Sequence, residues 1–156
     1  MQIDLKYEGQ WRQSMFGKRK SNLLIPTNER FDTLIGKTSE IYGRMVVGES
    51  LRIDGKVVGN IESEEDSKVT VAIGESGEVI GDIFAHRVMI AGKVEGNIYA
   101  TERVEFHQTA QVRGDVTYGS IGIEHGAKVL GLVIQQVDKK TANQASDVIR
   151  AMQEKR

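Results

Sequence analysis

A seven-residue phrase, glycine-x-hydrophobic-x-glycine-x-hydrophobic, recurs along the chain and restricts its fold more than any other feature. It reads GKVVGNI at residues 55–61, GEVIGDI at residues 77–83 and GKVEGNI at residues 92–98. Looser copies begin at Ser39, Ala110 and Ala127. Self-similarity at a nearly constant period is typical of a solenoid, in which each repeat packs only against its neighbours.

The period of the repeat indicates which kind of solenoid to expect. The second glycines of the six copies are Gly43, Gly59, Gly81, Gly96, Gly114 and Gly131. Their intervals of 16, 22, 15, 18 and 17 residues are too short for helical repeats, which need about 33 to 47 residues. Three short strands joined by tight corners fit this length, and alternating pairs such as Val71 and Ile73 are typical of strands with one buried face. The sequence therefore predicts an all-β solenoid of about six coils.

The residues at the expected corners support this interpretation. Glycine turns a corner readily because it adopts positive φ without steric cost. Asn60, Asp82, Asn97 and Asp115 follow four of the glycines, and we expect them to tolerate a left-handed backbone at the corner. The longest interval contains the acidic residues 62–68, which we interpret as a surface insertion. A metal site is the alternative for this loop.

Charge divides the chain into three parts. Residues 1–32 hold six basic against four acidic residues, residues 33–136 hold ten against fifteen, and residues 137–156 hold five against three. We predict a flexible tail over residues 1–32, a core over residues 33–136 and a second flexible tail over residues 137–156. The chain has no cysteine, no apolar run near the roughly 20 residues of a membrane span and no signal-peptide pattern, so we expect it inside the cell.

Stacked coils leave two exposed ends, and this property leads to a function. The end coils of such a rod carry unpaired backbone groups and the open end of the apolar core, which is a template for joining another chain. The last coil is unusually apolar because of Leu130, Leu132, Val133 and Ile134. Residues 143–154 could form a helix that caps this end, but we favour a tail that leaves the end open.

Two other classes of function remain as alternatives. An acyltransferase with a left-handed β-helix would repeat every six residues and use a catalytic histidine, whereas the glycines here recur at four and then about twelve or thirteen residues. The three histidines do not share one position in the repeat, and the phosphate-binding pattern G-x-x-x-x-G-K-[ST] is absent. We expect no catalytic residue, cofactor or metal ligand. A rigid adaptor that does not polymerise is the second alternative.

The block VAIGESGEVIGDIFAHRVMIAGKVEGNI at residues 71–98 resembles the bactofilins, a family of bacterial cytoskeletal proteins, and the similarity covers about residues 33–136. The resemblance implies a right-handed, three-sided β-helix with disordered tails. It also implies nonpolar filaments that form without nucleotide, through head-to-head and tail-to-tail contacts, and that scaffold cell-wall enzymes or polarity proteins. No nucleic-acid partner is expected. The assembly contacts would lie at the terminal coils, near Leu34, Ile35 and Ile41 at one end and Leu130, Leu132, Val133 and Ile134 at the other.

The segment MFGKRK at residues 15–20 resembles the membrane-targeting peptide of many bactofilins. Met15 and Phe16 can enter the bilayer interface while Lys18, Arg19 and Lys20 face anionic lipid, at about 1 kcal/mol for each basic residue. The resemblance implies a location at the inner face of the cytoplasmic membrane. The family usually has this peptide at its very start, whereas fourteen residues precede it here. A basic patch without a lipid role is the alternative.

Overall fold

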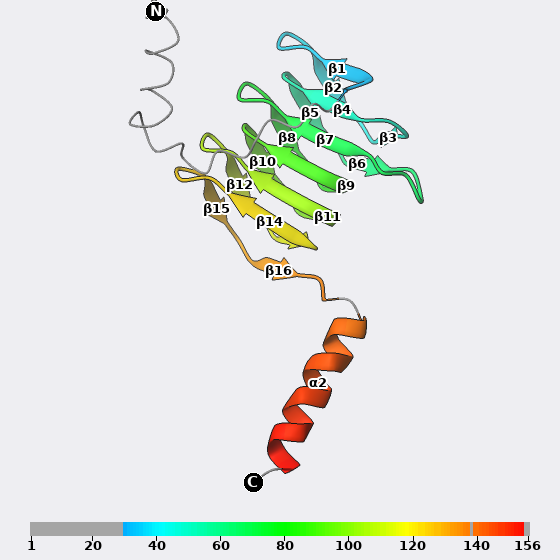
Figure 1. The fold of residues 1–156 in the computed structure, drawn as a ribbon. Coiled ribbons are helices and arrows are strands. Elements are labelled where there is room, and N and C mark those ends of the chain that lie inside the picture. The colour runs from blue at the N-terminus through cyan, green and yellow to red at the C-terminus, as the bar shows by residue number, and fades with distance from the viewer. Residues whose placement is uncertain (1–29, 138, 155–156) are drawn as a thin grey trace, which may run out of the picture.

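The chain from Arg30 onward folds into a column of parallel strands with one helix after it (Figure 1). The computed structural model describes residues 30–137 and 139–154. Six coils, each with three strand segments, stack along one axis, and neighbouring coils are joined by parallel pairing throughout. The segment MFGKRK, like the rest of residues 1–29, lies outside the described residues.

Each coil contributes one strand segment to each of three faces, which we call face 1, face 2 and face 3. Face 1 consists of β1 (Thr33–Ile35), β4 (Leu51–Ile53), β7 (Thr70–Ile73), the second halves of β9 (Ile83–Ile90) and β11 (Ile98–Phe106), and β14 (Ser120–Ile123). Face 2 consists of β2 (Glu40–Tyr42), β5 (Lys56–Val58), β8 (Glu78–Ile80), β10 (Lys93–Glu95), β12 (Gln111–Arg113) and β15 (Lys128–Leu130). Face 3 consists of β3 (Met45–Val47), β6 (Ile61–Ser63), the first halves of β9 and β11, β13 (Val116–Tyr118) and β16 (Val133–Gln135).

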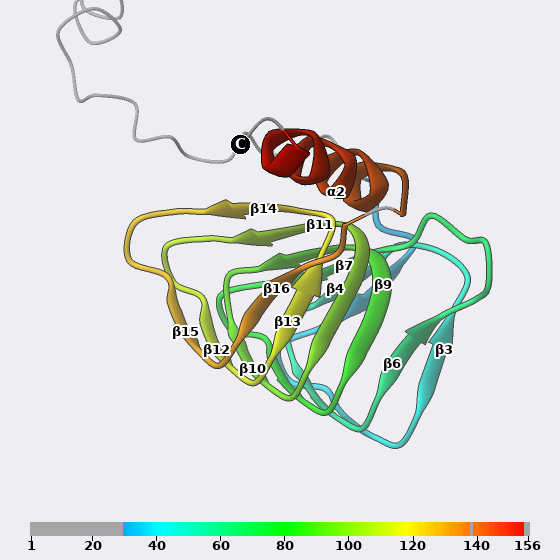
Figure 2. The same cartoon turned by 90° about the horizontal axis from the view of Figure 1, so that it is seen from below.

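The hand of the solenoid follows from the view along its axis. Figure 2 is seen from the C-terminal end, and its outline is three-sided. The last coil passes through β14, β15 and β16 anticlockwise as the chain advances toward the viewer, so the solenoid is right-handed (Figure 2). The predicted right-handed, three-sided parallel solenoid of about six coils is therefore confirmed.

Aliphatic columns along the axis form the core. Leu51, Val71, Val88 and Val104 are register partners on successive coils, and each is fully buried. Burial of each such side chain contributes about 1.5–3 kcal/mol relative to leaving it exposed. The alternation seen in the sequence is thus the alternation between core-facing and outward-facing residues on each strand.

Glycines form the corner between faces 2 and 3, where a side chain would meet the backbone of the previous coil. The six predicted corner glycines all have positive φ, between 132° and 152°. A Cβ atom added to Gly59 would lie 2.0 Å from the carbonyl oxygen of Gly43, and the same 2.0 Å separation recurs between Gly96 and Gly81. No side chain fits in that space, so the repeated glycine is required by the stacking itself.

The Asn and Asp residues that follow these glycines act differently from our prediction. Among the described residues, Asp66 in the inserted loop is the only non-glycine residue with positive φ, so the corner Asn and Asp are not left-handed. Each instead accepts a hydrogen bond from the backbone of the next coil. Asn60 Oδ1 accepts from the N–H of Asp82 at 3.0 Å, and Asp82 Oδ1 accepts from that of Asn97 at 2.8 Å. The ladder continues through Asn97 and Asp115 to the backbone N–H of Leu132.

Two segments depart from the regular coil. Residues 64–69 connect β6 to β7 across the corner between faces 3 and 1. The connections at the same corner of other coils are shorter: residues 48–50 join β3 to β4, and Gly119 alone joins β13 to β14. This places the predicted surface insertion at a corner.

Helix α2 (Lys139–Glu154) lies within the C-terminal segment that we expected to be a flexible tail, and it begins before the suggested start at Asn143.

Substitution of a corner glycine tests the importance of this close approach. Gly96→Ala should destabilise the solenoid by at least about 1–3 kcal/mol, because the new Cβ imposes a strained backbone and meets the carbonyl of Gly81. Denaturant unfolding of purified protein measures the difference. Gly36→Ala is the matched control, since an added Cβ there has no atom within 4 Å. Equal midpoints for the two variants would contradict the role of the glycine corner.

Candidate assembly interfaces at the two ends of the solenoid

The first and last coils each have one unpaired side. Among the described residues, β1, β2 and β3 pair only with the second coil, and β14, β15 and β16 pair only with the fifth. The outer backbone N–H and C=O groups of these six strands therefore face away from the solenoid. Edge strands of this kind can bind another strand, and they favour aggregation unless they are covered.

At the N-terminal end, side chains of the core layer are only partly covered. Ile41 is the register partner of the fully buried Val57, and Met45 is the partner of Ile61, yet both end residues remain half-exposed. Ile35 is the exception, because it is only 5% exposed. Leu34 points outward, in register with Arg52, and is 62% exposed. Of the three residues predicted here, Leu34 and Ile41 are accessible at the end and Ile35 belongs to the core.

At the C-terminal end, the core layer is more exposed. Ile123 is the register partner of the fully buried Phe106, but it is itself 57% exposed. Val133 is the partner of the fully buried Val116 and is 44% exposed. These two side chains occupy core positions, and no further coil among the described residues lies beyond them. The core therefore ends in an open apolar layer.

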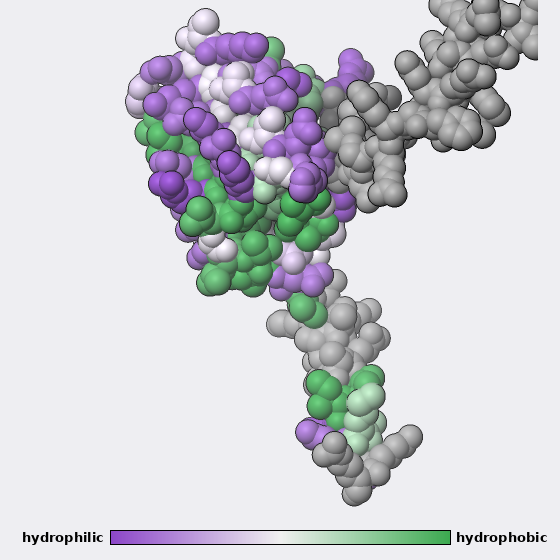
Figure 3. Space-filling model, turned by 90° about the vertical axis from the view of Figure 1, so that its left-hand side faces the viewer, coloured by the Kyte–Doolittle hydropathy of each residue, from purple (hydrophilic) through white to green (hydrophobic). Residues whose placement is uncertain are grey.

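The other predicted C-terminal residues form the rim of this layer. Leu130 is in register with Arg113 and Ile134 with Thr117, so both side chains point outward from the last coil. Leu132 stands where the preceding coil has Asp115, and it ends the ladder of Asn and Asp. All three are exposed, and Figure 3 shows hydrophobic surface gathered over the lower, C-terminal part of the solenoid.

Several core-facing residues at the two ends were not among the predicted interface residues. They are Met45 and Val47 in the first coil and Ile121, Ile123 and Val129 in the last. Alignment of the repeats would have found Met45, Ile121, Ile123 and Val129, because each stands at a position that is apolar in nearly every coil, whereas the position of Val47 is occupied by Ser63 in the next coil. The interface residues were predicted from their apolar character alone. That character does not distinguish side chains of the core layer from side chains at the rim.

Helix α2 does not cover the C-terminal end. In Figures 1 and 2 the helix projects beyond the last coil and lies to one side of it. Val148, Ile149 and Met152 on this helix are more than half exposed. No helix in the described part of the chain is long and apolar enough to span a bilayer.

Polar groups surround the N-terminal end. The Nε atom of Arg44 donates to Glu62 Oε2 at 3.0 Å, and this bonding lowers the pKa of Glu62 and raises the pKa of Arg44. The Tyr42 hydroxyl donates to Glu40 Oε2 at 2.8 Å, which raises the pKa of Tyr42. These pairs are exposed, so they contribute little to the stability of the fold.

Two of the histidines are paired along the sides of the solenoid. His86 contacts Glu102 at 2.8 Å and Thr101 at 3.0 Å, and His107 Nδ1 lies 2.9 Å from Glu124 Oε1. These contacts join adjacent coils. Within the described ranges, no three His, Cys, Asp or Glu side chains group closely enough to hold a metal ion.

Comparisons with known proteins agree with this architecture. The family model described as "Bactofilin: Polymer-forming cytoskeletal" matches residues 33–133. Bactofilin BacO of Myxococcus xanthus (strain DK1622) is 37% identical over 102 residues, which cover 65% of this chain and 78% of that protein. Bactofilin BacP of the same organism is 30% identical over 102 residues, which cover 65% of this chain and 41% of that protein. No solved structure matches the chain significantly.

The openness of the C-terminal end can be measured in the dilute, unassembled protein. Phe106→Ala should lower the free energy of unfolding by about 3–5 kcal/mol, whereas Ile123→Ala should lower it by less than about 1 kcal/mol, because little of Ile123 is buried. Denaturant unfolding at several protein concentrations gives both values. Equal losses at the lowest concentration would mean that the end is covered within a single chain.

Proposed function

The chain belongs to the bactofilin family, a polymer-forming cytoskeletal family, and on this premise we propose that it assembles end to end into nonpolar filaments without nucleotide. We further propose that these filaments lie at the inner face of the cytoplasmic membrane. There they organise cell-wall enzymes or polarity proteins. The single observation that best supports assembly through the ends is the open core layer at the C-terminal end, where Ile123 and Val133 occupy core positions but are exposed to solvent.

The geometry of the ends favours contacts between like ends. Each end presents three edge strands around an apolar layer, so a second copy of the same end can supply matching strands and apolar side chains. A contact of one surface with its own copy is isologous and has two-fold symmetry. Alternating N-terminal and C-terminal contacts of this type produce a filament without polarity.

The apolar residues alone supply a modest free energy. Five side chains at the C-terminal end are exposed by about half or more: Ile123, Leu130, Leu132, Val133 and Ile134. Covering each one contributes about 1 kcal/mol, so the ten side chains of two partners contribute about 10 kcal/mol. Association costs about 4–15 kcal/mol in lost rigid-body freedom. The gain and the cost are of similar size, so pairing of the edge strands would add to the net free energy of assembly.

Nucleotide has no evident role in such a contact. Burial of apolar surface and pairing of strands proceed without a bound cofactor, and the chain lacks the G-x-x-x-x-G-K-[ST] phosphate loop. Assembly should therefore depend on protein concentration and not on ATP or GTP.

Membrane binding is proposed from residues 15–20. One segment with two apolar and three basic residues binds anionic lipid weakly. A filament presents many copies of this segment, and binding through several copies at once strengthens attachment without any new contact. Assembly and membrane binding are then coupled, because only the polymer is firmly attached.

Charge placed at the C-terminal end should block assembly. We expect Val133→Arg, and likewise Leu132→Arg and Ile134→Arg, to abolish filaments in negative-stain images and in sedimentation. β-Sheet circular dichroism should stay unchanged, because these residues are already exposed. The matched control is Thr117→Arg, on the same face one coil inside the end and in register with Ile134. Filaments that persist in all three end variants would refute the C-terminal contact, and a wild-type protein that stays monomeric would favour the adaptor.

Removal of residues 1–20 should release the protein from liposomes that contain anionic lipid without preventing filament formation. Co-sedimentation with liposomes, with electron microscopy of the same samples, measures both properties. Phe16→Ser tests the apolar part of the segment, and a rise in salt concentration tests the basic part. Liposome binding that survives the truncation would exclude a lipid role for residues 15–20.

A further inference from the structure

Helix α2 carries an apolar surface that is open to solvent. Val148, Ile149 and Met152 lie within five residues of one another, at a spacing that places them on one side of the helix. Their exposed fractions are 54%, 57% and 68%, and Figure 3 shows hydrophobic surface on this part of the helix. Apolar side chains that gather on an exposed surface mark a site of contact with another protein surface.

Face 3 carries a second exposed apolar surface, which we call the aromatic pair. It consists of Phe84 and Tyr99, whose rings stack with centroids 4.7 Å apart and which are each 38% exposed. The pair stands in a column of register partners that continues through Thr117 to Ile134 at the rim of the C-terminal end. The aromatic pair is therefore continuous with the end through which the chain is proposed to contact a second copy.

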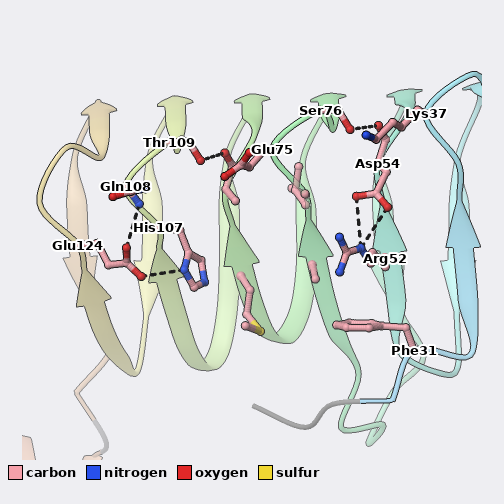
Figure 4. A pocket seen from close by; sticks show the side chains of 15 residues that line it. Phe31, Lys37, Arg52, Asp54, Glu75, Ser76, His107, Gln108, Thr109 and Glu124 are labelled. Carbon is pink, nitrogen blue, oxygen red and sulfur yellow. Dashed lines mark hydrogen bonds and ion pairs between the residues drawn. The ribbon is translucent and has the colours of Figure 1, made fainter. Parts of the chain in front are cut away.

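Face 1 has a groove in place of an exposed apolar surface. The groove crosses the coils, with Phe31 toward one end and the pair His107–Glu124 at the other, as Figure 4 shows. The ion pair of Arg52 with Asp54 also lines it. Covering these polar groups with apolar side chains would cost free energy, so the groove is a poor site for an apolar helix face.

Charged side chains occupy much of the remaining surface of faces 1 and 2. Glu105 points outward from face 1, because Val104 and Phe106 on either side of it face the core, yet it is 5% exposed. Its Oε1 atom accepts a hydrogen bond from Arg103 Nε at 2.6 Å and lies 3.5 Å from a terminal nitrogen of Arg87. The outward residues of the middle coils on face 2 are polar and exposed: Lys93, Glu95, Gln111 and Arg113. Face 3 is thus the side of the solenoid that best matches the helix.

We propose that helix α2 of one subunit packs on the aromatic pair of a second copy that is joined to it through the C-terminal ends. This inference rests on the proposed contact between two C-terminal ends. The helix projects beyond the last coil of its own solenoid, whereas the aromatic pair lies on the side of the middle coils, so the two surfaces do not meet in one molecule (Figure 1). A copy added to the C-terminal end occupies the space beside the helix.

The helix is long enough to reach the aromatic pair of the partner. Strands of adjacent coils lie about 4.8 Å apart, so the coils of Tyr99 and Phe84 in the partner lie about 14 and 19 Å beyond the last coil of the first copy. Helix α2 has 16 residues and extends about 24 Å. It continues in the direction in which the coils are stacked, so it passes both rings (Figure 1).

The side on which the helix lies determines the symmetry of the contact. In the view along the axis, helix α2 lies outside the three-sided outline on the side of β14, which belongs to face 1 (Figure 2). A two-fold axis through the corner between faces 1 and 3 places face 1 of each copy in line with face 3 of the other. Each helix then lies against face 3 of the partner, and β14 of one copy meets β16 of the other in antiparallel orientation.

The helix contact makes the C-terminal junction the stronger of the two. The end layers alone gain about as much free energy as association costs, so added apolar contact favours the bound state. No helix lies beside the N-terminal end among residues 30–137. Dimers joined through their C-terminal ends are then the units that polymerise.

Cysteine cross-linking between full-length chains tests the contact, because the protein has no native cysteine. Ile149→Cys protein is mixed with a size-tagged protein that has one cysteine on the third coil: Phe84→Cys on face 3, Ala72→Cys on face 1 or Glu78→Cys on face 2. Disulfide formation between the two proteins should be at least about tenfold faster with Phe84→Cys than with either control, because the contact raises the effective concentration. Tyr99→Cys, on the next coil of face 3, should behave like Phe84→Cys.

Substitutions on the helix and at the end separate the two contacts. Replacing Val148 and Met152 together by Ser should raise the protein concentration at which filaments sediment by about tenfold or more. Arg150→Ser is the matched control, since residue 150 lies on the opposite side of the helix. Val133→Arg, which disrupts the end contact, should slow the cross-link to Phe84→Cys to the rate of the controls. Circular dichroism checks that each variant folds.

Filaments without preferential cross-linking to face 3 would overturn this inference and leave the proposed assembly intact. Fastest cross-linking to Ala72→Cys would assign the helix to face 1 and would also overturn it, as would a face 3 cross-link that persists with Val133→Arg. A face 3 cross-link in a protein that forms only dimers would support the helix contact and refute the filament. A protein that neither assembles nor cross-links would refute both.

Discussion

The close approach of successive backbones at the glycine corner is the constraint on which the rest of the structure depends. Parallel strands pair at about 4.8 Å, and a coil can keep that spacing on all three faces only if its corners also stack. At the corner between faces 2 and 3, each glycine leaves no room for a Cβ beneath the carbonyl of the previous coil. The Asn and Asp ladder then satisfies backbone N–H groups at the same corner. The aliphatic columns of the core follow from this spacing.

The same stacking produces the two open ends. Every inner coil has a neighbour on both sides, so its apolar layer and its strand edges are covered. The first and last coils have only one neighbour, and no side-chain choice within a coil can change that. Natural β-proteins usually protect such edges. Here Ile123 and Val133 keep apolar side chains at core positions that are open to solvent, and helix α2 projects away from them. A solenoid that retains an open core layer is suited to growth by addition of further copies.

The three sides have different chemistry although one repeat builds them all. Face 2 has charges of opposite sign in register, such as Glu40 with Lys56 and Glu78 with Lys93. Face 3 carries a stacked aromatic pair, Phe84 and Tyr99, with ring centroids 4.7 Å apart. Face 1 has the groove and the buried carboxylate of Glu105. The repeat fixes the inward residues, and the outward positions are free to differ because the packing of the core does not constrain them.

The sequence by itself determined the solenoid, its number of coils and its corners, because the glycine period and the apolar alternation are local and repeat six times. It also indicated that the last coil is apolar. Only the tertiary structure decided which residues at the ends belong to the core layer, since this depends on register: Ile35 is buried while Ile123 is exposed, and hydrophobicity does not distinguish them. The bonds of Asn60 and Asp82 to the next coil, and the burial of the outward Glu105, were likewise set by contacts between residues distant in sequence. Such contacts have no local pattern, so they became visible only when the coils were stacked.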